Sequence, residues 1–143
     1  RPPRSTLDRS SAASDVYKRQ TWQREREAQY NVVTCLVAAD SVTEPFLVSE
    51  SLACGDWGSE VGIGPYGAMC IARHSYDGHS HCVYARIRRD GNWSRLLPIA
   101  QTDAFEGKPT VVADRQGRFW IVWEEGGRNW GKKFTSLDFP MTE

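Results

Sequence analysis

The stretch from Gly107 to Glu124 has the clearest pattern of apolar and polar positions in the chain. Thr110–Ala113 is a short run of β-branched and apolar residues, and Phe119–Trp123 is an unbroken aromatic and aliphatic run. Between them, Asp114–Gly117 has the composition of a tight turn. A strand with one solvated face alternates between apolar and polar residues, whereas a continuous apolar run indicates that both faces of the strand are buried. The pattern therefore predicts a β-hairpin inside a larger β assembly.

From Thr21 onward the chain repeats itself with a period near 50 residues. The aligned segments are Trp22–Ser51 with Arg73–Thr102 at a shift of 51 residues, and Ser59–Gly64 with Pro109–Asp114 at a shift of 50. Trp22, Arg73 and Trp123 then occupy equivalent positions. A long period built from short strands is typical of a propeller or a related repeat fold.

Each repeat is expected to contain four strands. In order, the expected strands are Val61–Gly64 and Thr110–Ala113 (first), Ala68–His74 and Arg118–Glu124 (second), Gln29–Val37 and His81–Arg88 (third), and Pro45–Ser49 and Leu96–Ala100 (fourth). Turn residues at Ser75–Ser80 and Arg89–Asn92 predict the hairpins that join them. Trp22–Gln29 has helical propensity, but the repeat assigns it to a loop between strands, and we expect a loop.

The sequence thus predicts an all-β fold, namely an incomplete β-propeller of about two four-stranded antiparallel blades behind a disordered N-terminal tail. The expected divisions are a tail at 1–20, a partial blade at 21–60, a complete blade at 61–100 and a partial blade at 101–143. Isolated blades bury too little surface to stand alone. We therefore expect neighbouring blades of a longer chain to be partners of this segment.

Residues 1–20 are rich in Ser, Arg and Pro and show neither helical nor strand periodicity, so their composition predicts disorder. Ser11–Gln20 also resembles a peptide that arises when sequencing-adapter DNA is translated, and we exclude the tail from the fold as artefactual. The alternative is a genuine basic arm. The chain has no initiator Met and no signal segment, so we expect the natural chain to begin earlier.

The formal net charge of the chain is zero, with 18 basic and 18 acidic residues. Residues 1–20 hold five of the basic and two of the acidic residues, which leaves 13 and 16 elsewhere, a net charge of −3. A mildly acidic domain without a basic stripe is not expected to bind nucleic acid. No apolar run approaches the ~20 residues that span a bilayer, so no membrane span is expected.

Four cysteines, Cys35, Cys54, Cys70 and Cys82, have spacings that match no Cys-x-x-Cys zinc pattern. We expect buried thiols that act as small hydrophobic groups. One disulfide is the alternative, with Cys70 and Cys82 as the first pair to test because they fall on strands expected to be neighbours. A metal site is the third possibility.

Several segments together resemble the blades of sialidase-like (BNR-type) β-propellers, over about residues 21–135. The segments are Ser75-Tyr76, His81-Cys82-Val83-Tyr84-Ala85-Arg86, Asp90-Gly91-Asn92-Trp93-Ser94, Pro109-x-Val111-x-Ala113-Asp114 and Gly117-x-x-Trp120-x-Val122-Trp123. The segment Trp123–Lys132 also resembles stretches of large bacterial proteins in which such a propeller precedes a metal-dependent phosphoesterase-like domain. The resemblance implies a secreted bacterial protein that is extracellular or periplasmic.

The sequence departs from sialidases in its Asp-box, Ser-x-Asp-x-Gly-x-x-Trp, which is absent. Asp90 and Gly91 are adjacent, and Asp114 lies three residues before Gly117 instead of two. Sialidases hold a substrate carboxylate with several arginines and use a Tyr nucleophile with a carboxylate partner. No residue of this chain is assigned a catalytic role.

Glu106 and Lys108, close to Asp103, are candidate ligand-binding residues. They precede an expected first strand, and the innermost strands of a propeller flank its central channel. A carboxylate beside an ammonium group can bind a polar ligand or perform acid–base chemistry. Trp130, within a charged segment, is a candidate platform for a sugar ring. For all of these residues the alternative is a solvated loop.

His74, His79 and His81 surround an expected hairpin loop. Residues i and i+2 of a strand face the same side, so His79 and His81 could share a metal. No carboxylate joins them in the sequence pattern, and we predict neither a metal nor a cofactor. A basic cluster, Arg86, Arg88 and Arg89, is explained by charged residues that protect an exposed strand edge. Trp93, Trp120 and Trp123 are expected to pack between blades.

These observations favour a non-catalytic propeller fragment that acts as a scaffold or binds a carbohydrate, a peptide or an adjoining domain. Two alternatives are a fragment of a sialidase-type glycoside hydrolase whose catalytic residues lie in other blades, and an accessory propeller of a metal-dependent hydrolase.

Overall fold

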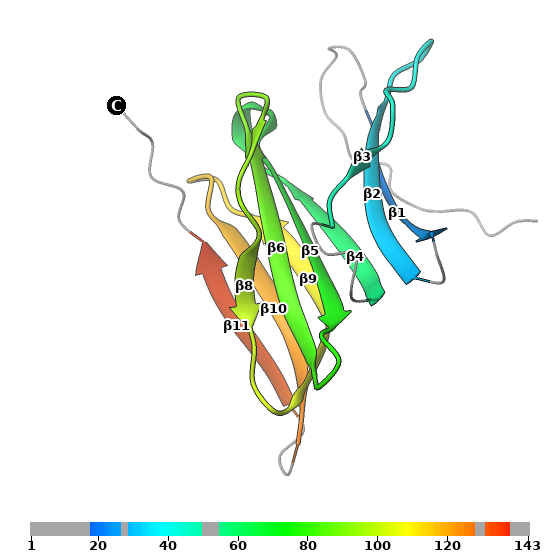
Figure 1. Ribbon diagram of the computed structural model, residues 1–143. Helices are drawn as coiled ribbons and strands as arrows, with labels where there is room; N and C mark the ends of the chain where they lie inside the picture. The colour runs from blue at the N-terminus through cyan, green and yellow to red at the C-terminus, as the bar shows by residue number, and fades with distance from the viewer. Residues whose placement is uncertain (1–17, 27–28, 50–54, 128–130, 138–143) are drawn as a thin grey trace, which may run out of the picture.

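The computed structural model describes residues 18–26, 29–49, 55–127 and 131–137. In this part the chain is all-β, with three antiparallel sheets and one short 3-10 turn, η1 (Pro65–Gly67) (Figure 1). The expected all-β class is therefore confirmed. Within these ranges no helix has the length and apolar character needed to cross a membrane.

The strands divide among the three sheets in chain order. Sheet 1 contains β1 (Lys18–Arg26), β2 (Gln29–Val37) and β3 (Phe46–Leu47); sheet 2 contains β4 (Gly55–Ile63), β5 (Met69–Tyr76), β6 (His81–Arg89), β7 (Asn92–Trp93) and β8 (Leu97–Ala100); sheet 3 contains β9 (Phe105–Ala113), β10 (Phe119–Gly126) and β11 (Gly131–Leu137). Each sheet is a meander of sequential neighbours, and β7 and β8 both pair with β6.

The sequence repeat is visible in the strand bounds. The bounds of β9 and β10 are those of β4 and β5 moved by 50 residues. Trp22, Arg73 and Trp123 lie on equivalent strands opposite Val33, Tyr84 and Lys133, respectively. The expected hairpin of β9 and β10 around Asp114–Gly117 is also present.

Several predicted boundaries are wrong. The first strands begin earlier than expected, at Gly55 and Phe105, because a bulge interrupts the pattern in each. Trp22–Gln29 is not a loop, since β1 runs from Lys18 to Arg26 and pairs along its whole length with β2. The cross-strand ladder overrides the local propensity. Residues 18–20 therefore belong to a strand, and residues 1–17 lie outside the described residues.

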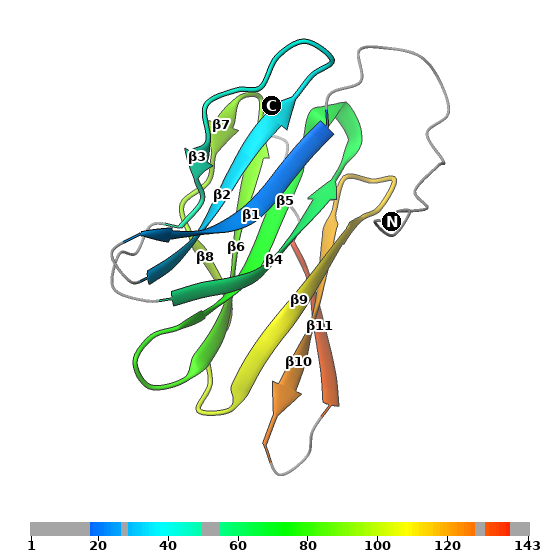
Figure 2. The ribbon, with the colours of Figure 1, turned by 90° about the vertical axis from the view of Figure 1, so that its right-hand side faces the viewer.

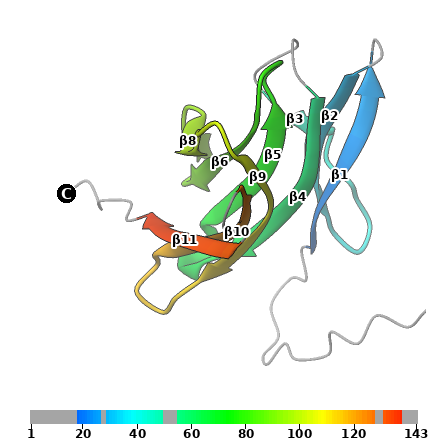
Figure 3. The same ribbon diagram turned by 90° about the horizontal axis from the view of Figure 1, so that it is seen from below.

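Sheet 2 lies between sheets 1 and 3 and is covered on both faces (Figures 2 and 3). Met69 and Ile71 of β5 pack towards sheet 1, in a buried cluster with Val32 and Val48. Cys70 and Ala72 point the opposite way, into a cluster that includes Val111, Phe119, Ile121 and Trp123 of sheet 3. This two-sided burial explains why the strands lack alternation in sequence.

The outer face of sheet 3 carries apolar side chains that no described residue covers. Val112 and Phe134 are 54% and 71% exposed. They lie opposite Trp120 and Val122, so the four residues form one patch across β9, β10 and β11. Trp120 thus faces outward, in contrast to the expected packing between sheets, whereas Trp93 and Trp123 do pack there.

The cysteine pair expected as an alternative does not form. Cys35, Cys70 and Cys82 are free and buried, while Cys54 lies outside the described residues. Cys70 pairs with Ile87, and Cys82 pairs with Ser75, five positions further along β5. At about 3.3 Å per residue the two thiols stand too far apart to bond.

The basic cluster of β6 does not mark an exposed edge either. This strand has β5 on one side and β7 and β8 on the other. The guanidinium group of Arg86 lies 5.7 Å from the rings of both Phe46 and Trp93, which stack in parallel 5.0 Å apart. The arginine therefore helps to join sheets 1 and 2.

Candidate functional site

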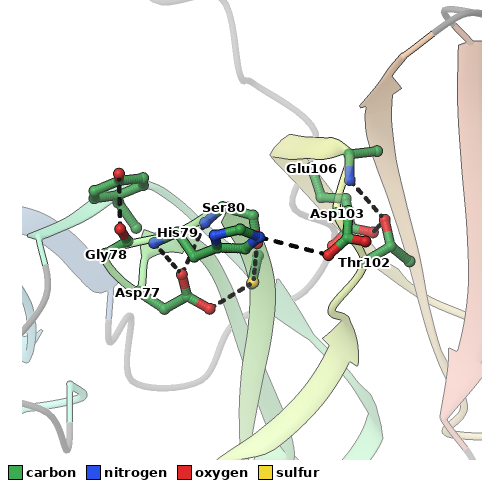
Figure 4. A network of polar contacts seen from close by, with 10 residues as sticks. Asp77, Gly78, His79, Ser80, Thr102, Asp103 and Glu106 are labelled. Atoms are coloured by element: carbon green, nitrogen blue, oxygen red, sulfur yellow. Dashed lines mark hydrogen bonds and ion pairs between the residues drawn. The ribbon is translucent and has the colours of Figure 1, made fainter.

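The candidate site lies at the end of sheets 2 and 3 where β4 and β9 begin, which we call the loop end. Its loops are the Asp77–Ser80 turn and the Gln101–Ala104 connection (Figure 4). The carboxylate of Asp77 shapes the turn, since one oxygen accepts the N–H groups of His79 and Ser80 at 2.8 Å each. These backbone hydrogen bonds, that of Ser80 first, lower the pKa of Asp77.

Glu106 holds the Gln101–Ala104 connection in place. Its side chain is fully buried, and one oxygen accepts a hydrogen bond from Thr102 Oγ1 at 2.7 Å. The same hydroxyl oxygen accepts the N–H of Ala104 at 3.1 Å. The second carboxylate oxygen has no hydrogen-bond partner among the described residues. As placed, Glu106 holds the loop and is not open to a ligand.

At the loop end, aromatic and imidazole rings from four strands form what we call the ring cluster. Its members are Trp57 of β4, His74 and Tyr76 of β5, His81 of β6 and Phe105 of β9. The ring of His81 lies at the centre, with centroids 5.0 Å from Phe105, 5.1 Å from Tyr76 and 5.8 Å from Trp57. Four of the rings are half-buried, and Tyr76 is 39% exposed.

The imidazole of His74 is held neutral at physiological pH. Burial, followed by the charges of His81 and Lys108, lowers its pKa from 6.5 to about 4. Its ring packs 5.9 Å from both Trp57 and His81. His74 therefore acts here as a flat, polar ring surface rather than as a cation.

Lys108 occupies a strained point of β9. Its φ of 48° lies in the left-handed region, at the bulge where the register with β10 shifts. Its Nζ reaches Glu124 at 3.1 Å in an exposed ion pair. The equivalent residue of β4 is Gly58, with φ 55°, which lies directly over the His74 ring. Strained residues of this kind often gather at functional sites.

A buried polar network lies behind the ring cluster, on the face towards sheet 1. Arg73 Nη1 donates hydrogen bonds to Asp56 and, at 2.6 Å, to Ser75, and the Ser75 hydroxyl also donates to Asp56. All three side chains are buried. The guanidinium also lies 5.6 Å from the Tyr84 ring. This network ties β4 to β5 just beneath the loop end.

The structure brings together only some of the residues predicted from the sequence. Glu106 and Lys108 both lie near the loop end, while Trp130 is outside the described residues. His74 and His81 are neighbours, but His79 points away and meets Asp103 at 3.6 Å in solvent. Among the described residues no three His, Cys, Asp or Glu side chains are placed to hold a metal ion.

Sequence reasoning missed Trp57, Tyr76 and Phe105. Trp57 and Phe105 fell outside the predicted first strands, which were drawn too short. The Tyr76–His81 pair was accessible, because the turn composition of Asp77–Ser80 already implies that these two residues face each other.

Searches against protein-family models, curated proteins and solved structures find no match for this chain. The evidence on function is therefore the geometry itself.

Proposed function

We propose that this chain is a segment of a β-propeller that acts as a non-catalytic carbohydrate-binding module, with the ring cluster as its binding surface. The observation that carries the proposal is the gathering of partly exposed rings from four strands at the loop end. Aromatic and imidazole rings present flat faces with polar edges, which suit the apolar face and hydroxyl rim of a sugar. On the resemblance stated above, such a module would function outside the cytoplasm.

The architecture supports the propeller part of this proposal. Three consecutive sheets repeat the same strand order, and each covers one face of the next. Sheet 3 covers one face of sheet 2. The equivalent face of sheet 3 is covered by no described residue, and it is apolar. A further sheet of the same kind would cover it, as expected of blades that need neighbours.

The test is binding of the purified chain to an array of neutral and acidic glycans, followed by calorimetry with the best ligand. Tyr76→Ala and Trp57→Ala should each weaken binding about tenfold or more, because each removes a stacking surface of roughly 1 kcal/mol or above. Tyr76→Ala is the cleaner variant, since its ring is the most exposed of the cluster.

Tyr30→Ala is the matched control. Tyr30 is 44% exposed on β2 of sheet 1 and is not a member of the ring cluster, so its removal should leave glycan binding unchanged. Failure to bind any glycan, or equal binding by wild type, Tyr76→Ala and Trp57→Ala, would refute the carbohydrate proposal.

A further inference from the structure

A cavity lies between sheets 1 and 2, where the rings of β3 and β7 meet (Figure 2). Its volume is about 340 Å³, within the roughly 300–1,000 Å³ typical of small-molecule sites. Its walls come from all three strands of sheet 1 and from β6 and β7 of sheet 2. The cavity shares no residue with the ring cluster.

Two guanidinium groups from different sheets line this cavity. Arg19 lies on β1, opposite Leu36 of β2, and Arg88 lies near the end of β6. Both side chains are half-buried. Burial, followed by the positive charge of Arg88, lowers the pKa of Arg19. The two groups are therefore close enough for their charges to repel each other.

The negative charge in the cavity does not balance these two arginines. Glu44 is the one acidic side chain among the described lining residues, and it is exposed. Within the described part of the chain, neither Arg19 nor Arg88 makes an ion pair or a side-chain hydrogen bond. The cavity therefore has an excess of positive charge.

The remaining walls combine a hydroxyl donor with an aromatic surface. Thr43 Oγ1 accepts the N–H of Leu36 at 2.9 Å, which leaves its hydroxyl hydrogen for another partner. The rings of Phe46 and Trp93 stack in parallel 5.0 Å apart, and Phe46 is 40% exposed. Such walls suit a ligand that has an anionic group and a ring.

We propose that this cavity binds a phosphate monoester carried on a sugar-sized molecule. Arg19 and Arg88 hold the phosphate, because its charge of about −1.5 to −2 and its several acceptor oxygens match two guanidinium groups. The hydroxyl of Thr43 donates to the same group, and the exposed part of the Phe46 ring contacts the sugar. A carboxylate, with a single charge, would leave one arginine without its own partner. This site is independent of the carbohydrate surface proposed for the loop end.

The test is calorimetric titration of the purified chain with glucose 6-phosphate, glucose 6-sulfate, inorganic phosphate and glucose. We expect glucose 6-phosphate to bind most tightly. The sulfate ester should bind more weakly because it has one negative charge, and inorganic phosphate because it lacks the sugar. Glucose should not compete with glucose 6-phosphate. Because partly exposed charges are screened, affinity should fall with added salt.

Variants of the two arginines test how the phosphate is held. Arg19→Ala and Arg88→Ala should each weaken binding of glucose 6-phosphate about tenfold or more, since hydrogen bonds to a charged group are lost. Arg88→Lys keeps the charge without the planar fork, so its affinity should be intermediate. Arg115→Ala is the matched control, because it removes the same charge from an exposed turn of sheet 3.

Variants of the other walls test the rest of the site. Glu44→Gln should tighten binding of glucose 6-phosphate, since it removes the negative charge from the lining. Phe46→Ala should weaken glucose 6-phosphate and leave inorganic phosphate unchanged. Tyr76→Ala, at the loop end, should not affect any of these probes.

Arg88→Lys retains an aliphatic stem and a charge, so it should fold normally, which circular dichroism can check. The proposal is overturned if glucose 6-phosphate does not bind at millimolar concentration, or if Arg115→Ala weakens binding as much as Arg88→Ala does. Equal affinity for glucose 6-phosphate and glucose 6-sulfate would also overturn it, because two negative charges would then not be required.

Discussion

Arg73 and Asp56 form a buried ion pair between β5 and β4, and Ser75 hydrogen-bonds to both. In the next repeat, 50 residues on, the Arg73 position holds Trp123 and the Asp56 position holds Glu106. One unit thus uses a salt bridge where its neighbour uses an aromatic ring. Equivalent positions of the repeat keep their burial while their chemistry changes.

Arg73→Met should destabilise the chain by about 3–5 kcal/mol, because it leaves the Asp56 carboxylate buried without its partner. The double variant Arg73→Met with Asp56→Leu should recover most of that loss, since two apolar side chains of similar size replace both charges. Urea denaturation of the four proteins of the cycle measures this. If the loss of unfolding free energy in the double variant equalled the sum of the losses in the two single variants, the two residues would not be coupled.

Trp123→Ala should cost about 3–5 kcal/mol, as expected for removal of a large side chain from a packed cluster. Trp123 is 8% exposed and lies between sheets 2 and 3. Trp120→Ala is the matched comparison on the same strand, and it should cost clearly less because that ring faces outward. Chemical denaturation of both variants checks the order; equal losses would contradict the assigned burial.

The free energy of unfolding should fall as the pH is lowered from about 6.5 to about 4. In this window His74 binds a proton in the unfolded chain but stays neutral in the folded chain, so protonation favours the unfolded state. The loss assignable to His74 is about 1–2 kcal/mol once partial solvent screening is allowed for. His74→Gln removes this component, and His79→Gln, in solvent, keeps it. The measurement is urea stability at several pH values; identical pH profiles for wild type and His74→Gln would contradict the prediction.

Lys108→Gly should stabilise the chain by up to about 1 kcal/mol, because glycine adopts a φ of 48° without steric cost. The gain is reduced by loss of the exposed ion pair to Glu124, worth a few tenths of a kcal/mol. Lys108→Ala loses the same pair and relieves no strain, so it should be neutral or destabilising. Thermal melting distinguishes them, and a more stable Ala variant would argue against backbone strain.

The isolated chain should self-associate through the open face of sheet 3, whose apolar patch includes Val112 and Phe134. Val112→Lys combined with Phe134→Glu should shift sedimentation profiles towards monomer. Tyr66→Ser, which removes an exposed ring at another place, should not. A wild-type chain that stays monomeric at high concentration would contradict this expectation.

Much of the strand pattern could be predicted from the sequence because the runs are strongly apolar and the repeat confirms them twice. Gln29–Val37 and the β9–β10 hairpin are examples. The early starts of β4 and β9 could not, since Gly58 and Pro109 interrupt the apolar pattern where the bulges lie. The strand β1 was missed because the repeat was interpreted as placing Trp22–Gln29 in a loop and residues 18–20 were assigned to the tail.

The sites were less accessible than the fold. The ring cluster joins four strands, and one cavity is lined by Tyr66, Arg89 and Arg115 from three separate turns or strand ends. No spacing along the chain brings these residues together; only the packing of sheet 2 against sheet 3 does so. Glu106 could be singled out as a carboxylate before a strand, but its complete burial follows from that same packing.

The bulge at Gly58 reverses the side to which β4 directs its residues. Trp57 pairs with His74 and faces sheet 3, whereas Val61, four residues later, pairs with Ile71 and packs towards sheet 1. An uninterrupted strand would point both in one direction. The number of residues in the bulge therefore sets the face to which the side chains of β4 before the bulge point. Deleting one residue at the bulge would invert their orientation, whereas many substitutions would leave it intact.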